Sequence, residues 1–177
     1  VFLGYMMTHP GKKLLFMGGE FGQFDEWKDL EQLDWFLLDY EMHGKCLDYV
    51  RQLNNFYLES SSLWEQDHQA EGFEWIDANN SHQSIISFIR RGKSKGDYLV
   101  IICNFTPEYY PDYKIGVPHA GGYKEIFNSD LEQYGGSNKY NQDICRTIEG
   151  EYHSQSYYIN IEIPPLAIII VQNHLTH

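Results

Sequence analysis

From Gly72 onward the sequence is a succession of short apolar segments separated by turn-forming residues. Residues 157–163 (YYINIEI) place Tyr157 and three isoleucines on one face and polar or amphipathic side chains on the other. This period of two is typical of a strand that lies between a core and solvent. Comparable strands are predicted at residues 72–78, 84–91, 98–105, 113–117, 122–127 and, after Pro164-Pro165, 166–171. Many short strands with frequent turns predict an antiparallel β-sandwich.

The first part of the chain has a different pattern, and we place the boundary near residue 70, with parts at residues 1–69 and 70–177. Residues 1–7 are predicted to end a helix at His9-Pro10-Gly11. The continuous apolar residues 13–17 predict a short buried strand of a parallel sheet. Residues 18–39 predict a long acidic loop. The spacing of the apolar residues Met42, Cys46, Tyr49, Leu53 and Phe56 then predicts an amphipathic helix that ends near residues 60–62.

Composition narrows the class of partner. The 177 residues carry a formal net charge of −12, and the 13 Lys and Arg residues are not clustered. Nucleic acid and anionic membranes are therefore unfavourable partners, and a neutral substrate fits better. No apolar stretch reaches the length of a membrane span. The three cysteines form no CxxC pair and favour a reducing, cytoplasmic compartment.

Glu20 is the first candidate for a catalytic acid, because it follows an apolar segment and a glycine pair. Hydrolysis or transfer of a sugar by acid/base chemistry requires two carboxylates on facing elements, whereas the other acids here are concentrated in the loop at residues 25–34. An acidic loop of that kind is usually only solvated. The sequence contains no HExxH, GxSxG, Walker A or GxGxxG motif, so we predict no metal site, no cofactor and no complete active site.

Several motifs, in order, resemble α-1,4-glucan branching enzymes of the α-amylase superfamily. They are KKLLFMGGEFGQ at residues 12–23, LDW at 33–35, GFEWID at 72–77, SFIRR at 87–91, ICNFTP at 102–107, YKIGVP at 113–118, GGYKEIFNSD at 121–130, YGGSN at 134–138 and PPLA at 164–167. The likeness extends over nearly the whole chain. It departs from the family pattern at Gly19, where those enzymes usually have Asn. The opening at Val1, within an apolar segment, suggests a chain cut from a longer one.

The resemblance implies an α+β fragment in which the last strand and helices of a (β/α)8 barrel precede the all-β C-terminal sandwich. Family members cleave an α-1,4 bond through a covalent glycosyl-enzyme and transfer the chain to a 6-hydroxyl, which makes the branches of glycogen. Their three catalytic carboxylates belong to earlier barrel strands, so the resemblance implies that this chain alone has no catalytic residue and is inactive. The alternative is a glucan-binding or scaffold module of a debranching or trehalose-releasing relative.

The same resemblance places residues 18–35 at the rim of a substrate cleft that binds α-glucan. Glu20, Trp27 and Trp35 are the candidate substrate-binding residues, since an indole ring can stack on the apolar face of glucose. The alternatives are that Glu20 hydrogen-bonds the loop backbone and that both tryptophans pack under the loop. We also expect the barrel part to lack most of its packing partners and to self-associate through its exposed apolar surface.

Overall fold

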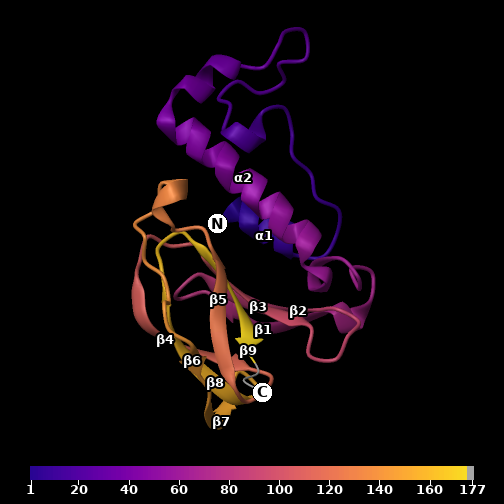
Figure 1. Ribbon diagram of the computed structural model, residues 1–177, viewed down its shortest axis with the longest axis vertical. Coiled ribbons are helices and arrows are strands. Elements are labelled where there is room, and N and C mark those ends of the chain that lie inside the picture. Colours follow the sequence, from indigo (N-terminus) through magenta and orange to yellow (C-terminus); the bar gives the residue numbers. More distant parts are fainter. Residues whose placement is uncertain (175–177) are drawn as a thin grey trace.

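The computed structural model describes residues 1–174, and their nine strands form two antiparallel sheets (Figure 1). The larger sheet has six strands in the order β1-β2-β3-β9-β5-β6, and the smaller has three in the order β4-β8-β7. The strands are β1 (Phe73–Asn80), β2 (Ile85–Arg91), β3 (Tyr98–Asn104), β4 (Tyr110–Val117), β5 (Gly122–Asn128), β6 (Cys145–Arg146), β7 (Ile148–Tyr152), β8 (Gln155–Ile163) and β9 (Ile168–His174). The predicted antiparallel sandwich is confirmed.

Two strands were not predicted, β6 and β7. The first has only two residues, and the second carries two glutamates around Gly150, which is a poor strand pattern. Both are nevertheless held by their neighbours, because β6 pairs with β5 and β7 pairs with β8. Tertiary pairing therefore overrides local preference at these two places.

One face of the six-stranded sheet packs against the three-stranded sheet. The core between them is aliphatic and centred on β3 and β8, where Val100, Ile102, Ile159 and Ile161 are at most 2% exposed. The predicted inward set of β8 is confirmed, since Ile159, Ile161 and Ile163 are buried while Asn160 is exposed.

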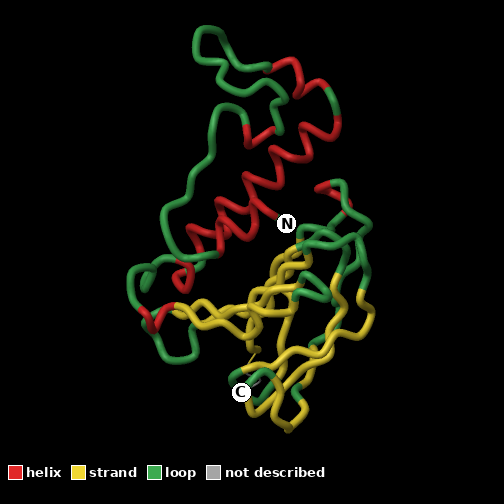
Figure 2. The backbone as a smooth tube through the Cα atoms, turned by 180° about the vertical axis from the view of Figure 1, so that it is seen from behind, coloured by secondary structure: helices red, strands yellow, loops and turns green. Residues whose placement is uncertain are grey.

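Helices cover the other face of the six-stranded sheet, so the sheet is the middle of three layers (Figures 1 and 2). The helices are α1 (Phe2–Thr8) and α2 (Glu41–Glu59), with short 3-10 turns η1 (Gly19–Phe21), η2 (Trp35–Asp39), η3 (Ser61–Leu63), η4 (Ala70–Gly72) and η5 (Glu132–Tyr134). This second core joins Met7, Tyr49 and Leu53 to the outward side chains of β2, β3 and β9. All seven residues of β3 are buried, which explains why that strand is apolar on both faces.

The predicted helix after residue 42 is confirmed, but the expectation that its apolar face lacks partners is wrong. Tyr49, Val50 and Leu53 are at most 8% exposed, because they pack on the β-sheet. Only the N-terminal end of the predicted stripe lies open, where Met42 is 58% exposed.

The predicted buried strand at residues 13–17 is also wrong. This segment is irregular, and Leu14 and Phe16 are 74% and 47% exposed. A strand is stable only when neighbouring strands complete its hydrogen-bond ladder, and no other part of residues 1–174 pairs with this segment.

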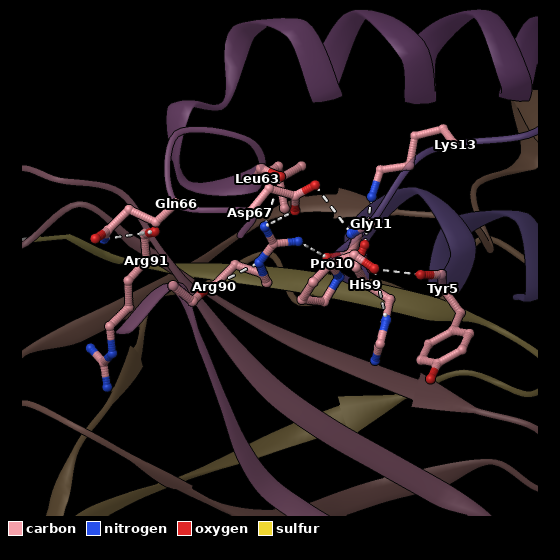
Figure 3. A network of polar contacts seen from close by, with 12 residues as sticks. Tyr5, His9, Pro10, Gly11, Lys13, Leu63, Gln66, Asp67, Arg90 and Arg91 are labelled. Carbon is pink, nitrogen blue, oxygen red and sulfur yellow. Dashed lines mark hydrogen bonds and ion pairs between the residues drawn. The ribbon is translucent and has the colours of Figure 1, made fainter. Parts of the chain in front are cut away.

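A buried arginine on β2 joins the helical layer to the sheet (Figure 3). The Arg90 guanidinium donates to the carbonyl of Thr8 at the end of α1, to the carbonyl of Leu63 at 2.8 Å and to the carbonyl of Gly72 at 3.3 Å. It also forms an ion pair with Asp67 at 2.7 Å. Burial lowers the pKa of Arg90, and the adjacent Asp67 carboxylate opposes that effect. Since a charge without partners would be very costly at this depth, the four acceptors have to be in place together.

Asp67 extends this network to the segment that follows α1. Its second carboxylate oxygen accepts the backbone N–H of Gly11 at 3.1 Å. Two residues further on, the Lys13 ammonium donates to the carbonyl of His9, and burial lowers the pKa of Lys13 to about 8. The start of the irregular segment is thereby fixed to the sheet through Asp67 and Arg90.

We predict that Arg90→Ala lowers the free energy of unfolding by about 3–5 kcal/mol, because three carbonyls lose a hydrogen-bond donor and the Asp67 carboxylate loses its cation. The matched control is Arg91→Ala, which removes a partly exposed ion pair with Glu74 and should cost about 1 kcal/mol. Urea denaturation followed by circular dichroism measures both values. Equal losses in the two variants would contradict the central role of Arg90.

Candidate functional site

The candidate site residues lie on the segment between α1 and α2, and a tight turn at residues 18–22 organises it. Gly18 and Gly22 have φ values of 81° and 71°, a left-handed conformation that favours glycine. Phe21 is fully buried beneath the turn. The carbonyl of Phe21 accepts a hydrogen bond from Nδ1 of His43 at 2.7 Å, which anchors the turn to α2. The apolar residues and the glycine pair that precede Glu20 therefore form a tight turn. Phe21, the neighbour of Glu20, anchors this turn to α2.

Glu20 lies half-buried on this turn, at the edge of a hollow of about 680 Å³ beside α2. The hollow has an apolar wall that includes Leu15, Leu33 and Leu47. Within residues 1–174 the Glu20 carboxylate makes no hydrogen bond or ion pair, so the expected bond to the loop backbone is not formed. Burial raises the pKa of the Cys46 thiol, and the nearby charge of Glu20 adds to this.

Trp27 lies in the exposed part of the loop, with 71% of its surface accessible. Its ring meets the edge of Phe16, with 5.0 Å between centroids and planes inclined by 64°. It borders a second hollow of about 430 Å³ that residues 24–31 form by themselves. Trp27 is thus not packed under the loop, and most of the indole is available to a ligand.

Trp35 begins η2 and is half exposed, at 50%. Its ring lies against Phe21, with 5.2 Å between centroids and planes 35° apart. Asp34 fixes the chain just before Trp35. Its carboxylate pairs with Lys28 at 2.5 Å, and its N–H donates to the Gln23 side chain at 2.9 Å. The hydrogen bond to Asp34 raises the pKa of Lys28. Trp35 is therefore part packed and part exposed.

The three predicted residues share one supporting segment but not one cavity. Trp27 contacts Phe16, Trp35 contacts Phe21, and Glu20 precedes Phe21. None of the hollows described within residues 1–174 is lined by all three. Such an arrangement offers aromatic faces and one carboxylate at a surface, which suits binding of a sugar better than bond cleavage, for which two opposed carboxylates are needed.

The part of the chain that the structure describes contains no group of three or more His, Cys, Asp or Glu side chains arranged to hold a metal ion. Neither α1 nor α2 is a helix that could cross a membrane.

Arg90 and Asp67 are the residues that support the site and that sequence reasoning missed. A signal was present, because Arg90 has the same strand parity as Ile86 and Phe88 and therefore points toward the helical layer. Arginine is normally assigned to a solvent face, and only the tertiary structure identifies the carbonyls that satisfy it.

Fold and site together define a class: an antiparallel two-sheet β-domain with a helical segment packed on its larger sheet, presenting aromatic side chains from a long loop. The sequence profile described as "Alpha amylase, C-terminal all-beta domain" matches residues 75–174, which is more than half of the chain. The chain therefore belongs to the family of α-amylase C-terminal all-β domains.

Individual relatives are more specific. The chain is 58% identical over 166 residues to the 1,4-alpha-glucan branching enzyme GlgB of Halothermothrix orenii, covering 94% of this chain and 26% of that protein. It is 57% identical to the GlgB of Bacillus cereus strain AH820, covering 96% of this chain and 26% of the relative. These matches confirm the predicted resemblance to branching enzymes, and the chain spans about a quarter of the length of the curated relatives it matches.

Among solved structures, the crystal structure of an α-amylase from H. orenii resembles the present one with a TM-score of 0.58. The alignment covers 97% of this chain and 34% of that chain, at 16% sequence identity. The likeness shows that the two share a fold.

We predict that Phe21→Ala loosens the turn that carries Glu20 and supports Trp35. Removing a fully buried ring should cost about 3 kcal/mol and shift tryptophan emission to longer wavelength as Trp35 loses its packing partner. The control Phe24→Ala removes a ring that is 77% exposed and should change stability by no more than about 0.5 kcal/mol. Urea denaturation and fluorescence spectra test this, and unchanged emission in the Phe21 variant would contradict it.

Proposed function

We propose that this chain is the C-terminal part of a cytoplasmic glycogen branching enzyme, whose whole protein cleaves α-1,4-glucan and transfers the released chain to a 6-hydroxyl. The observation that carries the proposal is the 57–58% identity to GlgB proteins over nearly all of this chain. The motifs of the irregular segment and of the β-domain both fall inside that alignment. The three free cysteines agree with a reducing compartment.

In this proposal residues 1–69 are the end of a catalytic (β/α)8 barrel and residues 70–177 are the C-terminal domain. In this proposal the exposed side chains of Leu14 and Phe16 would be covered by the rest of the barrel. The packing of α2 on β3 and β9 supports a rigid connection between the two parts. The β-domain would support the last barrel helix. Through that helix it would also hold the loop at residues 18–39 in place.

The loop at residues 18–39 would form one rim of the substrate cleft. Trp27 and Trp35, which are 71% and 50% exposed, would stack on glucose rings of an α-glucan. Glu20, which has no partner within residues 1–174, would accept hydrogen bonds from sugar hydroxyls. No bond-making or bond-breaking step is assigned to these side chains, so the chain alone is expected to be inactive.

We also propose that the isolated chain self-associates through its helical part. Large apolar side chains are exposed there in unusual number, and such surfaces are normally covered. The exposed residues are Phe2, Leu14, Phe16, Phe24, Trp27, Leu30, Trp35, Phe36, Tyr40, Met42, Leu58 and Trp64.

An iodine-stain assay on amylose tests the main proposal. The protein encoded by the complete reading frame should lower the absorbance of the amylose–iodine complex and produce α-1,6 linkages, because it supplies the catalytic carboxylates. Residues 1–177 alone should leave both unchanged. Branching by the isolated chain would refute the assignment of the catalytic groups to another part of the protein. Debranching or trehalose release by the complete protein would instead identify a different relative.

Light scattering tests the self-association. The isolated chain should have the mass of a dimer or larger assembly, and Leu14→Glu combined with Leu58→Glu should shift it toward the monomer by charging that surface. The matched control is Ile148→Glu on β7, which lies outside the helical part and is 46% exposed. A monodisperse wild-type monomer would rule out this part of the proposal.

A further inference from the structure

A surface groove runs between α2 and the far end of β5, away from the loop at residues 18–39. It consists of two adjoining hollows of about 320 Å³ and 350 Å³. Both are lined by the same four residues, Ile126, Phe127, Asn128 and Leu131, so they meet over the end of β5. In Figure 1 the orange turn that contains η5 lies near α2. Gln133 and Tyr134 of this turn line the first hollow.

The floor of the groove is aromatic. Phe127 is buried, and its ring lies 5.1 Å from that of Phe56 on α2. Tyr134 of η5 lies nearly parallel to Phe127, with 6.5 Å between centroids and 22° between planes. At the far end Tyr140 is 40% exposed and lines the second hollow. Aromatic side chains at the base of a hollow can contact the apolar face of a pyranose ring.

The rim of the groove consists mainly of carboxamides. Gln52 and Asn55 project from exposed positions of α2, and within residues 1–174 neither side-chain amide is hydrogen-bonded. Gln133 and Gln142 occupy exposed positions along the rest of the rim. Because a carboxamide both donates and accepts, it matches a hydroxyl group, which also does both.

The deeper polar groups are already fixed by the protein. Glu125 accepts hydrogen bonds from Asn128 at 2.8 Å and from Asn141 at 2.7 Å, and burial raises the pKa of its carboxyl. Asn141 also bonds the backbone of Glu162 in both directions, which ties the groove to β8. Gln52 and Asn55 are therefore free to bind a ligand, whereas Gln142 already donates to the Tyr140 hydroxyl at 2.8 Å. Free amides over a rigid floor are the arrangement expected of a preformed binding site.

We propose that this groove binds a linear, neutral α-1,4-glucan outside the substrate cleft. The combination of aromatic floor and amide rim selects an uncharged, polyhydroxylated chain, and the net charge of −12 disfavours a polyanion. Two adjoining hollows accommodate successive sugar units. The choice of an α-glucan among neutral sugars rests on the proposed function, whereas the location of the site rests on the geometry alone.

Binding to the complete chain tests the site. Titration with maltoheptaose by calorimetry, together with retardation in glycogen-containing gels, should show binding by the wild type. Gln52→Ala combined with Asn55→Ala should weaken the affinity about tenfold, which corresponds to the loss of two ordinary hydrogen bonds. Tyr140→Ala should weaken it by a similar factor through lost stacking. All of these side chains are exposed, so circular dichroism spectra should remain those of the wild type.

The matched control is Gln69→Ala, an exposed glutamine before η4 and outside the groove, which should bind as the wild type does. Absence of wild-type binding to maltoheptaose would overturn the proposal. So would binding that the groove variants retain but that Trp27→Ala abolishes, since the ligand would then occupy the loop. Equal affinity for cellohexaose would refute the selection of an α-glucan. None of these results changes the outcome of the iodine assay, so the two proposals fail independently.

Discussion

The buried guanidinium of Arg90 is the interaction on which the rest of the structure depends. Its four acceptors come from Thr8 at the end of α1 and from Leu63, Asp67 and Gly72 in the segment between α2 and β1, so two distant pieces of chain meet the sheet at one charge. Hydrophobic packing alone would let the helical layer slide over the flat, aliphatic face of the sheet. Directional hydrogen bonds to a buried cation fix its position instead, since any displacement exposes an unpaired charge to a medium of low polarity.

The sequence was informative wherever one residue pattern had one physical meaning. Strict alternation in β8 and the four-three spacing in α2 both identified the correct element and its buried side. The strand prediction for residues 13–17 was wrong because a continuous apolar run is found both in strands that are buried on both faces and in segments that have no neighbouring strand. β3 has the same character and does form a strand, because β2 and β9 flank it. What separated the two cases was long-range pairing, which a local pattern does not contain.

The sequence likewise predicted one part of the candidate binding surface and not the other. Glu20, Trp27 and Trp35 were selected from motifs. The exposure of the two tryptophans and the unpaired carboxylate of Glu20 within residues 1–174 are compatible with contact to a ligand. The groove over β5 could not be predicted from the sequence. In the sequence Gln52 and Asn55 are ordinary surface residues of a helix, and only the tertiary structure places η5 beside them. Its rim is assembled from α2, η5 and the loop before β6. Sites made by the docking of elements far apart in sequence leave no spacing signature.

The strand order has a consequence for biosynthesis. β9 lies in the middle of the six-stranded sheet, between β3 and β5, although it is the last of the nine strands to be translated. Until it emerges from the ribosome, β3 and β5 lack their shared neighbour and the aliphatic faces on both sides of the sheet stay open. The sheet can therefore be completed only at the end of translation of this region, and so can the surface on which α1 and α2 pack. The nascent chain is consequently most vulnerable to aggregation and most dependent on chaperones just before β9 leaves the ribosome.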